Sequence, residues 1–171
     1  PEDRMTMGLI TELSIADNVI LGYQKKFQKK GIFNLKKVHK YAAECIKNFL
    51  IKAPNENVKC SSLSGGNQQK VVIARVFNQN PDVIIVAQPT RGVDIGASEY
   101  IHEKLRELRD SGKAILLVSA DLDEVKALSD NLMVIYDGKI VARGKTETFT
   151  DTQLGLLMTG AEEKKEESLN E

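Results

Sequence analysis

Two short apolar runs, separated by a stretch with helical periodicity, constrain the fold of this chain more than any other feature. The first, "VIIVA", covers residues 83–87, and the second, "AILLVS", covers residues 114–119. Between them, Ile101 and Leu105 are spaced so that both would lie on the inner face of a helix over about residues 95–109. Strands that are apolar throughout and alternate with helices are typical of a parallel sheet covered by helices. The chain is therefore predicted to have an α/β fold.

The first third of the chain has a different pattern. Residues 1–62 are predicted to form a mostly helical subdomain, with Ser14 and Asn34 as the N-caps of two helices. The second of these helices has an apolar stripe that would face a core. Its members are Val38, Tyr41, Ala42, Cys45, Ile46, Phe49 and Leu50.

Residues 63–160 are predicted to form the α/β core. A helix over residues 64–79 precedes the first apolar run, and Asp137-Gly138 is a strong signal for a type I′ turn between two strands. Residues 161–171, "AEEKKEESLNE", contain almost nothing to bury and are predicted to be a disordered, charged tail.

Composition argues against several classes of function. Acidic and basic residues balance at 24 each, which argues against a nucleic-acid partner. No apolar run approaches the ~18 residues that a membrane span requires. Cys45 and Cys60 lack the spacing of metal ligands, so no metal site is predicted and a reduced, intracellular state is expected. Because the chain begins with proline rather than methionine, we interpret it as a piece of a longer protein.

The segment "SLSGGNQQK", residues 62–70, is the most informative one for function. Ser64, Gly65 and Gly66 stand where a helix begins, so their backbone N–H groups would be bare at the positive end of the helix dipole. Glycine permits close approach, and the serine adds a hydroxyl donor, which together favour binding of a phosphate. The alternative is a serine-capped helix after a flexible turn.

In its wider context this segment resembles the nucleotide-binding domain of ABC transporters, a P-loop NTPase-like fold. "LSGGNQQK" is followed at similar spacing by "ARVFNQNPDVIIVAQPTRGVD" and "AILLVSADLDEV". The resemblance covers roughly residues 1–160. It is strongest to the C-terminal nucleotide-binding domain of the two-domain ATPases that power bacterial uptake of simple sugars and nucleosides, and "AQPTRGVD" favours the nucleoside branch.

In this family two ATPase domains pair head to tail with ATP between them. The resemblance implies that Ser64, Gly65 and Gly66 contact the γ-phosphate of an ATP held by the partner domain, with Gln68 nearby. Asp94 matches the aspartate of the D-loop, which crosses the dimer interface. A plainer alternative for Asp94 is the N-cap of the helix that follows it.

The resemblance also implies a membrane partner. Glu2 falls where the family has its Q-loop glutamine, and residues 1–60 lie where such proteins contact the membrane permease subunit. The alternative for this region is a helical cap that stabilises the sheet. The implied location is cytoplasmic, at the inner face of the cell membrane, where a solute-binding protein would be engaged only indirectly.

Three positions that carry the family's chemistry are substituted. The family has an Mg²⁺-holding aspartate, a water-polarising glutamate and a γ-phosphate-contacting histidine where this chain has Ala87, Gln88 and Ala120. None of these side chains supplies a carboxylate or an imidazole, so the site that they would build is expected to be catalytically degenerate. ATP and Mg²⁺ would serve the full assembly, and neither is expected to bind this chain tightly.

The glycine-rich phosphate loop of the family would precede residue 1. The segment "GKIVARGKT", residues 138–146, ends in Gly-Lys-Thr but alternates as a strand, whereas a phosphate loop needs a bare turn between strand and helix. The isolated chain is therefore predicted to be inactive as an ATPase. Strands that would pair with a missing portion are expected to be exposed and prone to self-association.

Three functions are compatible with these residues. The first is a part of the ATP-binding subunit of an ABC importer that offers its signature helix to a partner-held ATP. The second is a non-hydrolysing module that couples the permease to a partner ATPase domain, and the third is an ABC ATPase outside transport. The intact "LSGGNQ" favours the first, because a docking scaffold alone does not need bare glycines at the start of a helix.

Overall fold

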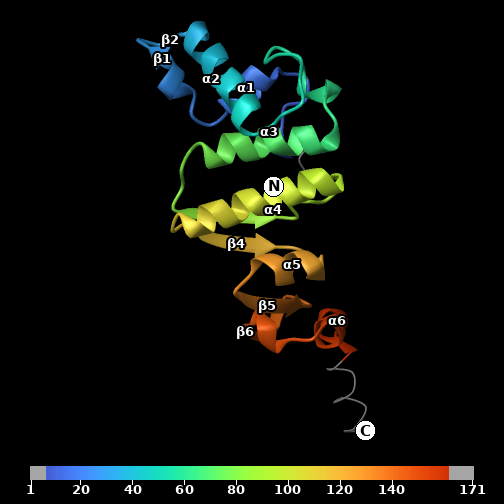
Figure 1. Ribbon diagram of the computed structural model, residues 1–171. Helices are drawn as coiled ribbons and strands as arrows, with labels where there is room; N and C mark the ends of the chain where they lie inside the picture. Colours follow the sequence, from blue (N-terminus) through green and yellow to red (C-terminus); the bar gives the residue numbers. More distant parts are fainter. Residues whose placement is uncertain (1–6, 162–171) are drawn as a thin grey trace, which may run out of the picture. The chain divides into compact units, whose positions relative to one another are not determined.

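The structure, a computed structural model, describes residues 7–161. The predicted α/β fold is confirmed, with helices alternating with short strands along the chain (Figure 1). The described part of the chain divides into two compact units, the first ending at Leu116 and the second beginning at Leu117. The domain boundary predicted at residues 62/63 does not coincide with this division and stays a prediction. Glu2, and the predicted tail apart from Ala161, lie outside the described residues.

The first unit begins with a small helical region. It contains α1 (Ile15–Val19), a 3-10 turn η2 (Gln24–Phe27), the strands β1 (Gln28–Lys29) and β2 (Ile32–Phe33), α2 (Leu35–Asn48) and a second 3-10 turn η3 (Cys60–Ser62). Both predicted N-caps are confirmed: Ser14 accepts a hydrogen bond from the Asp17 amide, and Asn34 accepts one from the Lys37 amide. These short polar side chains satisfy N–H groups that a helix start otherwise leaves bare.

The apolar stripe on α2 faces the core as far as the helix extends. Val38, Ala42, Cys45 and Phe49 are buried. The helix α1 packs against α2 and against the helix of residues Gly65–Phe77. The prediction was wrong for Leu50, which is 61% exposed. Leu50 follows the C-cap of α2 and has φ of +50°, so its side chain no longer follows the helical direction of the stripe.

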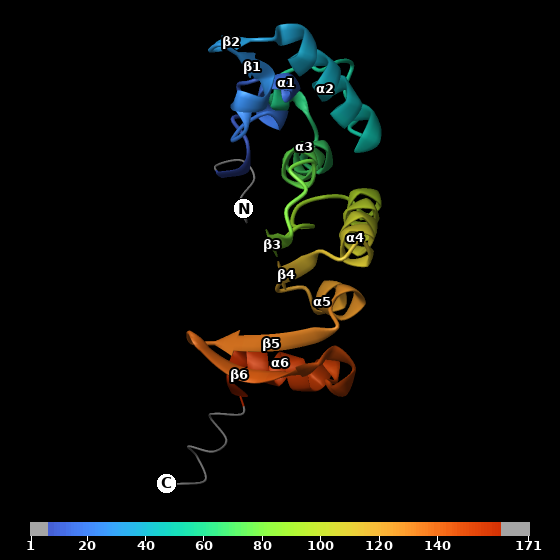
Figure 2. The same ribbon diagram turned by 90° about the vertical axis from the view of Figure 1, so that its left-hand side faces the viewer.

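The helix α3 (Gly65–Phe77) contacts α1, α2 and α4 (Ile95–Asp110). The strands β3 (Val83–Ala87) and β4 (Ala114–Val118) are hydrogen-bonded neighbours, and in Figures 1 and 2 α4 runs alongside them. Their starts lie together, because the Ala114 amide donates to the Asp82 carbonyl at 2.9 Å and Lys113 pairs with Asp82 at 3.1 Å. Two strands that start side by side and are joined through a helix form a parallel pair, as predicted.

This parallel pair has one open face within the described part of the chain. Ile84 is 2% exposed, whereas alternate residues on the two strands are exposed by 46–70%. These residues are Val83, Ile85, Leu116 and Val118. The strands are apolar on both faces, but the described elements cover only one of them.

The second unit contains α5 (Leu122–Leu128), β5 (Asn131–Tyr136), β6 (Lys139–Lys145), a 3-10 turn η4 (Thr146–Thr148) and α6 (Asp151–Thr159). The predicted hairpin is confirmed: β5 and β6 are antiparallel with Tyr136 opposite Lys139, and Asp137 and Gly138 both have positive φ. The "GKIVARGKT" segment is therefore a strand and not a phosphate loop. The core of this unit is formed by Leu132, Val134 and Leu154.

Candidate functional site

The start of α3 has the free donors that the sequence predicted. Ser64 is the N-cap and is exposed, but its side chain does not cap a backbone N–H group. Instead Asn67 Nδ2 donates to Ser64 Oγ at 2.9 Å. The first amide of the helix with a backbone acceptor is that of Gln68, which donates to the Ser64 carbonyl at 2.9 Å. Within residues 7–161 no hydrogen bond engages the amides of Gly65, Gly66 and Asn67.

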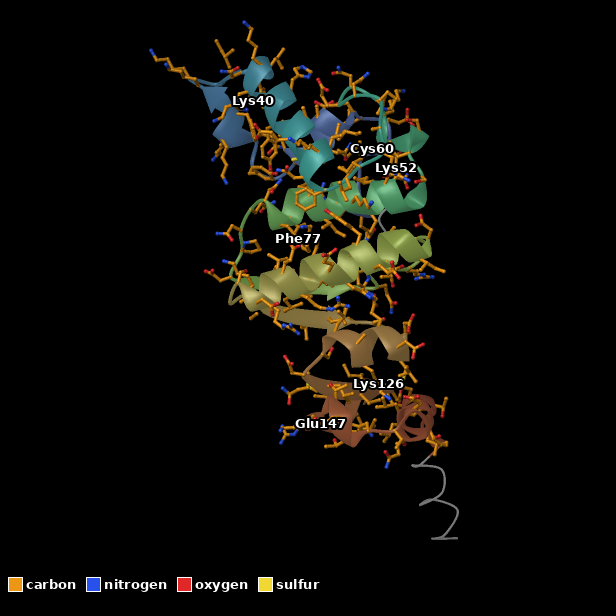
Figure 3. The ribbon with its side chains drawn as sticks, in the orientation of Figure 1. Lys40, Lys52, Cys60, Phe77, Lys126 and Glu147 are labelled. Atoms are coloured by element: carbon orange, nitrogen blue, oxygen red, sulfur yellow. The ribbon has the colours of Figure 1, made fainter. Side chains whose placement is uncertain are left out.

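The hydrogen bond from Asn67 leaves the Ser64 hydroxyl able to donate. Because the amide nitrogen of Asn67 already fills a lone pair on Ser64 Oγ, the hydroxyl proton can point away from the protein. Asn67 Oδ1 in turn accepts from the Lys52 backbone amide at 2.7 Å, which ties the preceding loop to this end of the helix. Figure 3 labels Lys52 beside the start of α3. We call the Ser64 hydroxyl and the amides of residues 65–67 the signature tip.

Gly66 has a packing role in addition to any role in binding. A Cβ atom built on Gly66 would lie 3.0 Å from the Ala97 Cβ and 3.2 Å from Asp94 Oδ2, so the start of α4 approaches the backbone of α3 closely. Asp94 Oδ1 accepts from the Ala97 amide at 2.9 Å, which confirms Asp94 as the N-cap of α4. The interface role implied for Asp94 stays a prediction, but the structure places its carboxylate beside Gly66.

Lys70 lies in the second turn of α3 and ties this turn to neighbouring segments. The sequence pattern did not predict this role. Its Nζ donates to the Leu50 carbonyl at 3.2 Å and lies 4.6 Å from the centre of the Tyr100 ring. Burial lowers the pKa of Lys70, and the charge of Asp94 partly opposes that shift. The signal available in the sequence was its position at the end of "SGGNQQK", one to two turns after Ser64.

Gln68 faces inward from the signature tip. Its side chain is 5% exposed, and Nε2 donates to the Cys60 carbonyl at 3.0 Å. Cys60, labelled in Figure 3, belongs to the 3-10 turn that leads into α3. The observed contact fixes the entry to the helix, and the implied place of Gln68 near a phosphate stays a prediction.

The end of β3 does not supply the groups that a metal site needs. Ala87 ends the strand, and Gln88 follows with φ of +49° and a carbonyl that accepts from the Arg91 amide at 3.2 Å. Ala120, after β4, is exposed. Among residues 7–161 no group of three or more His, Cys, Asp or Glu side chains could hold a metal ion. A methyl group and a neutral amide at the end of β3 do not fit Mg²⁺, which prefers carboxylate oxygens.

The two cysteines do not take part in this site. Both are free and buried, and burial raises the pKa of each thiol to about 11. A thiol that stays protonated at neutral pH is a poor nucleophile and a poor metal ligand.

The model of the ABC transporter family matches residues 4–91 of the 171, a stretch that includes the signature tip and the end of β3. The chain belongs to the ABC transporter family. No helix within residues 7–161 of this ABC transporter chain is long and apolar enough to cross a membrane.

Curated relatives of this ABC transporter chain are import proteins. It is 46% identical over 162 residues to the nucleoside import ATP-binding protein NupA of Lactococcus lactis subsp. cremoris. It is 42% identical over 166 residues to the guanosine import ATP-binding protein NupO of Bacillus subtilis. It is 40% identical over 162 residues to the ribose import ATP-binding protein RbsA of Lacticaseibacillus paracasei. These matches cover 94%, 96% and 95% of this chain but only 32% of each relative.

Solved structures support the fold of this ABC transporter chain. The ATP-binding cassette MJ0796, in a dimeric post-hydrolysis state bound to ADP and Pi, matches with a TM-score of 0.67 at 30% identity. The match covers 82% of this chain and 60% of that one. Another dimeric structure of MJ0796, a bacterial ABC transporter cassette, matches with a TM-score of 0.66, also at 30% identity.

Proposed function

We propose that this chain is part of the ATP-binding subunit of an ABC importer for nucleosides or simple sugars, and that its signature tip binds an ATP carried by a second ATPase domain. The observation that supports the proposal most is the set of free donors at the start of α3. Ser64 is exposed, Gly65 is partly exposed, and the amides of residues 65–67 have no hydrogen-bond acceptor among the described residues. A helix start with unsatisfied amides attracts anions through both hydrogen bonding and the helix dipole.

The signature tip acts on the terminal phosphate by binding and orienting it. The amides of Gly65 and Gly66 donate to phosphate oxygens, and the Ser64 hydroxyl adds a third donor whose direction Asn67 sets. Lys70 and the Asp94 cap hold the neighbouring turns of α3 and α4, so the donors are in place before the anion arrives. Preorganised donors of this kind stabilise charge without reorganisation when the ligand binds.

Activation of water is assigned to residues outside this chain. Gln88 has no carboxylate to act as a base, and neither Ala87 nor Ala120 has a polar side-chain atom. Magnesium chemistry, where the assembly uses it, depends on ligands that this chain does not supply. The chain contributes binding of the phosphate and closure of the domain pair, and hydrolysis takes place with groups from the partner.

The relatives support the class of solute and of partner. NupA and NupO are named for import of nucleosides and guanosine, and RbsA for import of ribose. On this basis the transported solute is a nucleoside or a simple sugar, and residues 1–60 contact the permease at the inner face of the membrane. A solute-binding protein would act through the permease alone.

A charge-bearing substitution at Ser64 tests this proposal. Ser64→Arg in the full-length transporter, reconstituted with its permease, is expected to abolish ATP-driven nucleoside uptake, because the arginine side chain fills the space of the terminal phosphate. Ser61→Arg is the matched control, since Ser61 is also exposed and its amide is engaged with the Thr11 carbonyl at 2.8 Å. Uptake that is unchanged by Ser64→Arg would refute the role of the signature tip.

One observation favours the module that couples partners without touching nucleotide. Gly66 is buried against α4, so packing alone accounts for that glycine. Photo-crosslinking with an azido-ATP in the reconstituted transporter separates the two functions. Loss of the label on Ser64→Arg supports ATP binding at the tip, and unchanged labelling together with lost uptake supports the coupling module.

A further inference from the structure

The strongest local concentration of positive charge lies away from the signature tip. Residues 18–43 contain no acidic residue and seven lysines, at positions Lys25, Lys26, Lys29, Lys30, Lys36, Lys37 and Lys40. All seven are exposed. Within the described chain none of them forms an ion pair with a carboxylate. We call residues 25–40 the basic end of the helical region.

Apolar side chains project from the same surface. Ile32 is 74% exposed, Leu35 63% and Phe33 40%, and every residue from 29 to 37 is exposed. The strands β1 and β2 pair through Lys29 and Ile32, with a two-residue turn in which Lys30 and Gly31 have φ of 53° and 80°. This short hairpin therefore presents apolar residues between lysines, with no described element packed over them.

The base of the hairpin is held firmly. Phe27 is 4% exposed, and its ring centre lies 5.1 Å from that of Tyr41 and 6.1 Å from that of Tyr23. The Asn34 amide donates to the Phe27 carbonyl at 2.8 Å, which closes the hairpin onto the start of α2. Aromatic pairs at such distances stabilise the fold beyond the burial of their surface. The exposed apolar residues Ile32 and Phe33 therefore project from an ordered base.

The basic end is separate from the signature tip within the first unit. In Figures 1 and 2, β1, β2 and the start of α2 lie at the far end of the helical region from α3. Figure 3 labels Lys40 at this end and Lys52 at the start of α3. A ligand at the basic end would therefore not compete with an anion at the signature tip.

The chemistry of the basic end discriminates between classes of partner. Protein interfaces are depleted in lysine and enriched in arginine, whereas residues 18–43 contain seven lysines and no arginine. Three of the four aromatic side chains in this stretch pack against one another at the base of the hairpin. Sequence-specific contacts to nucleic-acid bases rely strongly on arginine, amides and stacked aromatics. Clustered lysines interleaved with exposed aliphatic residues match an anionic lipid surface, which attracts the charges and accepts the apolar tips.

We propose that the basic end binds the anionic lipid surface of the membrane directly, with its lysines against the headgroups and Ile32 and Leu35 inserted at headgroup level. The contact requires neither ATP nor the permease, so it goes beyond the proposed function and survives if that function fails. It would hold the subunit at the membrane surface and orient the helical region toward it.

Vesicle flotation of the purified full-length protein, without permease or nucleotide, tests the proposal. We expect flotation with vesicles of phosphatidylcholine plus phosphatidylglycerol, weak flotation with phosphatidylcholine alone, and loss of binding as salt rises. A lysine near an anionic surface contributes about a fivefold gain in partitioning, so the triple variant K29Q/K30Q/K36Q should bind roughly 100-fold more weakly. The variant I32S/L35S should bind roughly tenfold more weakly, because less apolar surface leaves water.

The control variant carries the same change of charge elsewhere. Lys47, Lys139 and Lys145 are also exposed, so K47Q/K139Q/K145Q should stay within about twofold of wild type if the location of the charge matters. Equal flotation of wild type on neutral and anionic vesicles would overturn the proposal, and so would wild-type binding by K29Q/K30Q/K36Q. Tighter binding of wild type to single-stranded or duplex nucleic acid than to anionic vesicles would overturn it in favour of a nucleic-acid partner.

Discussion

Ser64 differs from an ordinary N-cap in what its side chain does. At Ser14, Asn34, Asp94 and Asp121 the side chain accepts from a backbone amide of its own helix. At Ser64 the side chain accepts from Asn67 instead, and the helix amides stay open. The sequence identified Ser14, Asn34 and Asp94 as candidate caps because capping depends on residues only two or three positions apart. It could not show that the Asn67 side chain would donate to the Ser64 hydroxyl. Either side chain could instead have accepted from a backbone amide of α3 or faced solvent.

A matched pair of glycine substitutions tests the packing beneath the signature tip. Gly66→Ala is expected to destabilise the protein by about 1–3 kcal/mol, because the new Cβ would lie 3.0 Å from the Ala97 Cβ. Gly96→Ala should be neutral or slightly stabilising, since its Cβ would meet only Asp94 Oδ1 at 3.5 Å and alanine favours a helix. Urea unfolding of the full-length protein measures both. Equal stability of the two variants would contradict the close approach of α4.

Individual residues mark the limit of inference from the sequence. Gln68 reads as a polar residue in a binding motif, but the fold turns it toward the Cys60 carbonyl. Leu50 continues the apolar spacing of α2, but the helix ends before it. Both outcomes depend on contacts between segments distant in the chain or on where a helix stops, and neither is encoded by local spacing.

Among the elements, the helices and strands between residues 64 and 119 were predicted with nearly the observed bounds, whereas the β1–β2 hairpin and α6 were not predicted. Residues 83–87 form β3 as predicted, and α4 extends one residue beyond the predicted end at 109. Continuous apolar runs with turn signals between them leave few other positions where the strands could begin and end. The open face of the β3–β4 pair was not visible in that pattern, because the sequence of a strand does not say which of its faces the same chain covers. The expected self-association through such strands stays a prediction.

The hairpin and α6 of the second unit offer a sharp test of element packing. Gly160, the C-cap of α6, has φ of +68°, and a Cβ on it would overlap the Tyr136 ring. Gly160→Ala should therefore destabilise the unit by about 2 kcal/mol or more, from steric overlap and an unfavourable left-handed alanine. Gly155→Ala, inside the same helix with nothing within 4 Å, should stabilise by about 0.5–1 kcal/mol.

Thermal unfolding followed by the circular dichroism of the full-length protein compares these two α6 variants. The expected order of melting temperatures is Gly155→Ala, wild type, Gly160→Ala. If Gly160→Ala melted with the wild type, the observed contact between the end of α6 and β5 would be incorrect.

At the scale of the whole molecule, average properties conceal the features that matter. The chain has no net charge, with 24 basic and 24 acidic residues, yet residues 18–43 contain seven lysines and no acid. The neutral total argued against nucleic acid but said nothing about a local surface. Family membership was likewise predicted from motif order, since "LSGGNQQK" and the two apolar runs occur at the spacing of ABC transporters, and it is confirmed by the family match over residues 4–91.

A cryo-EM structure of the full-length transporter, with its permease and a non-hydrolysable ATP analogue, would show directly what the signature tip binds. We expect the terminal phosphate of an analogue held by another ATPase domain to lie about 3 Å from the Gly65 and Gly66 amides and from Ser64 Oγ. We also expect that Ala87 and Gln88 contact no metal ion. A closed domain pair in which the start of α3 faces water, or packs on protein with no phosphate within hydrogen-bonding distance, would contradict the account.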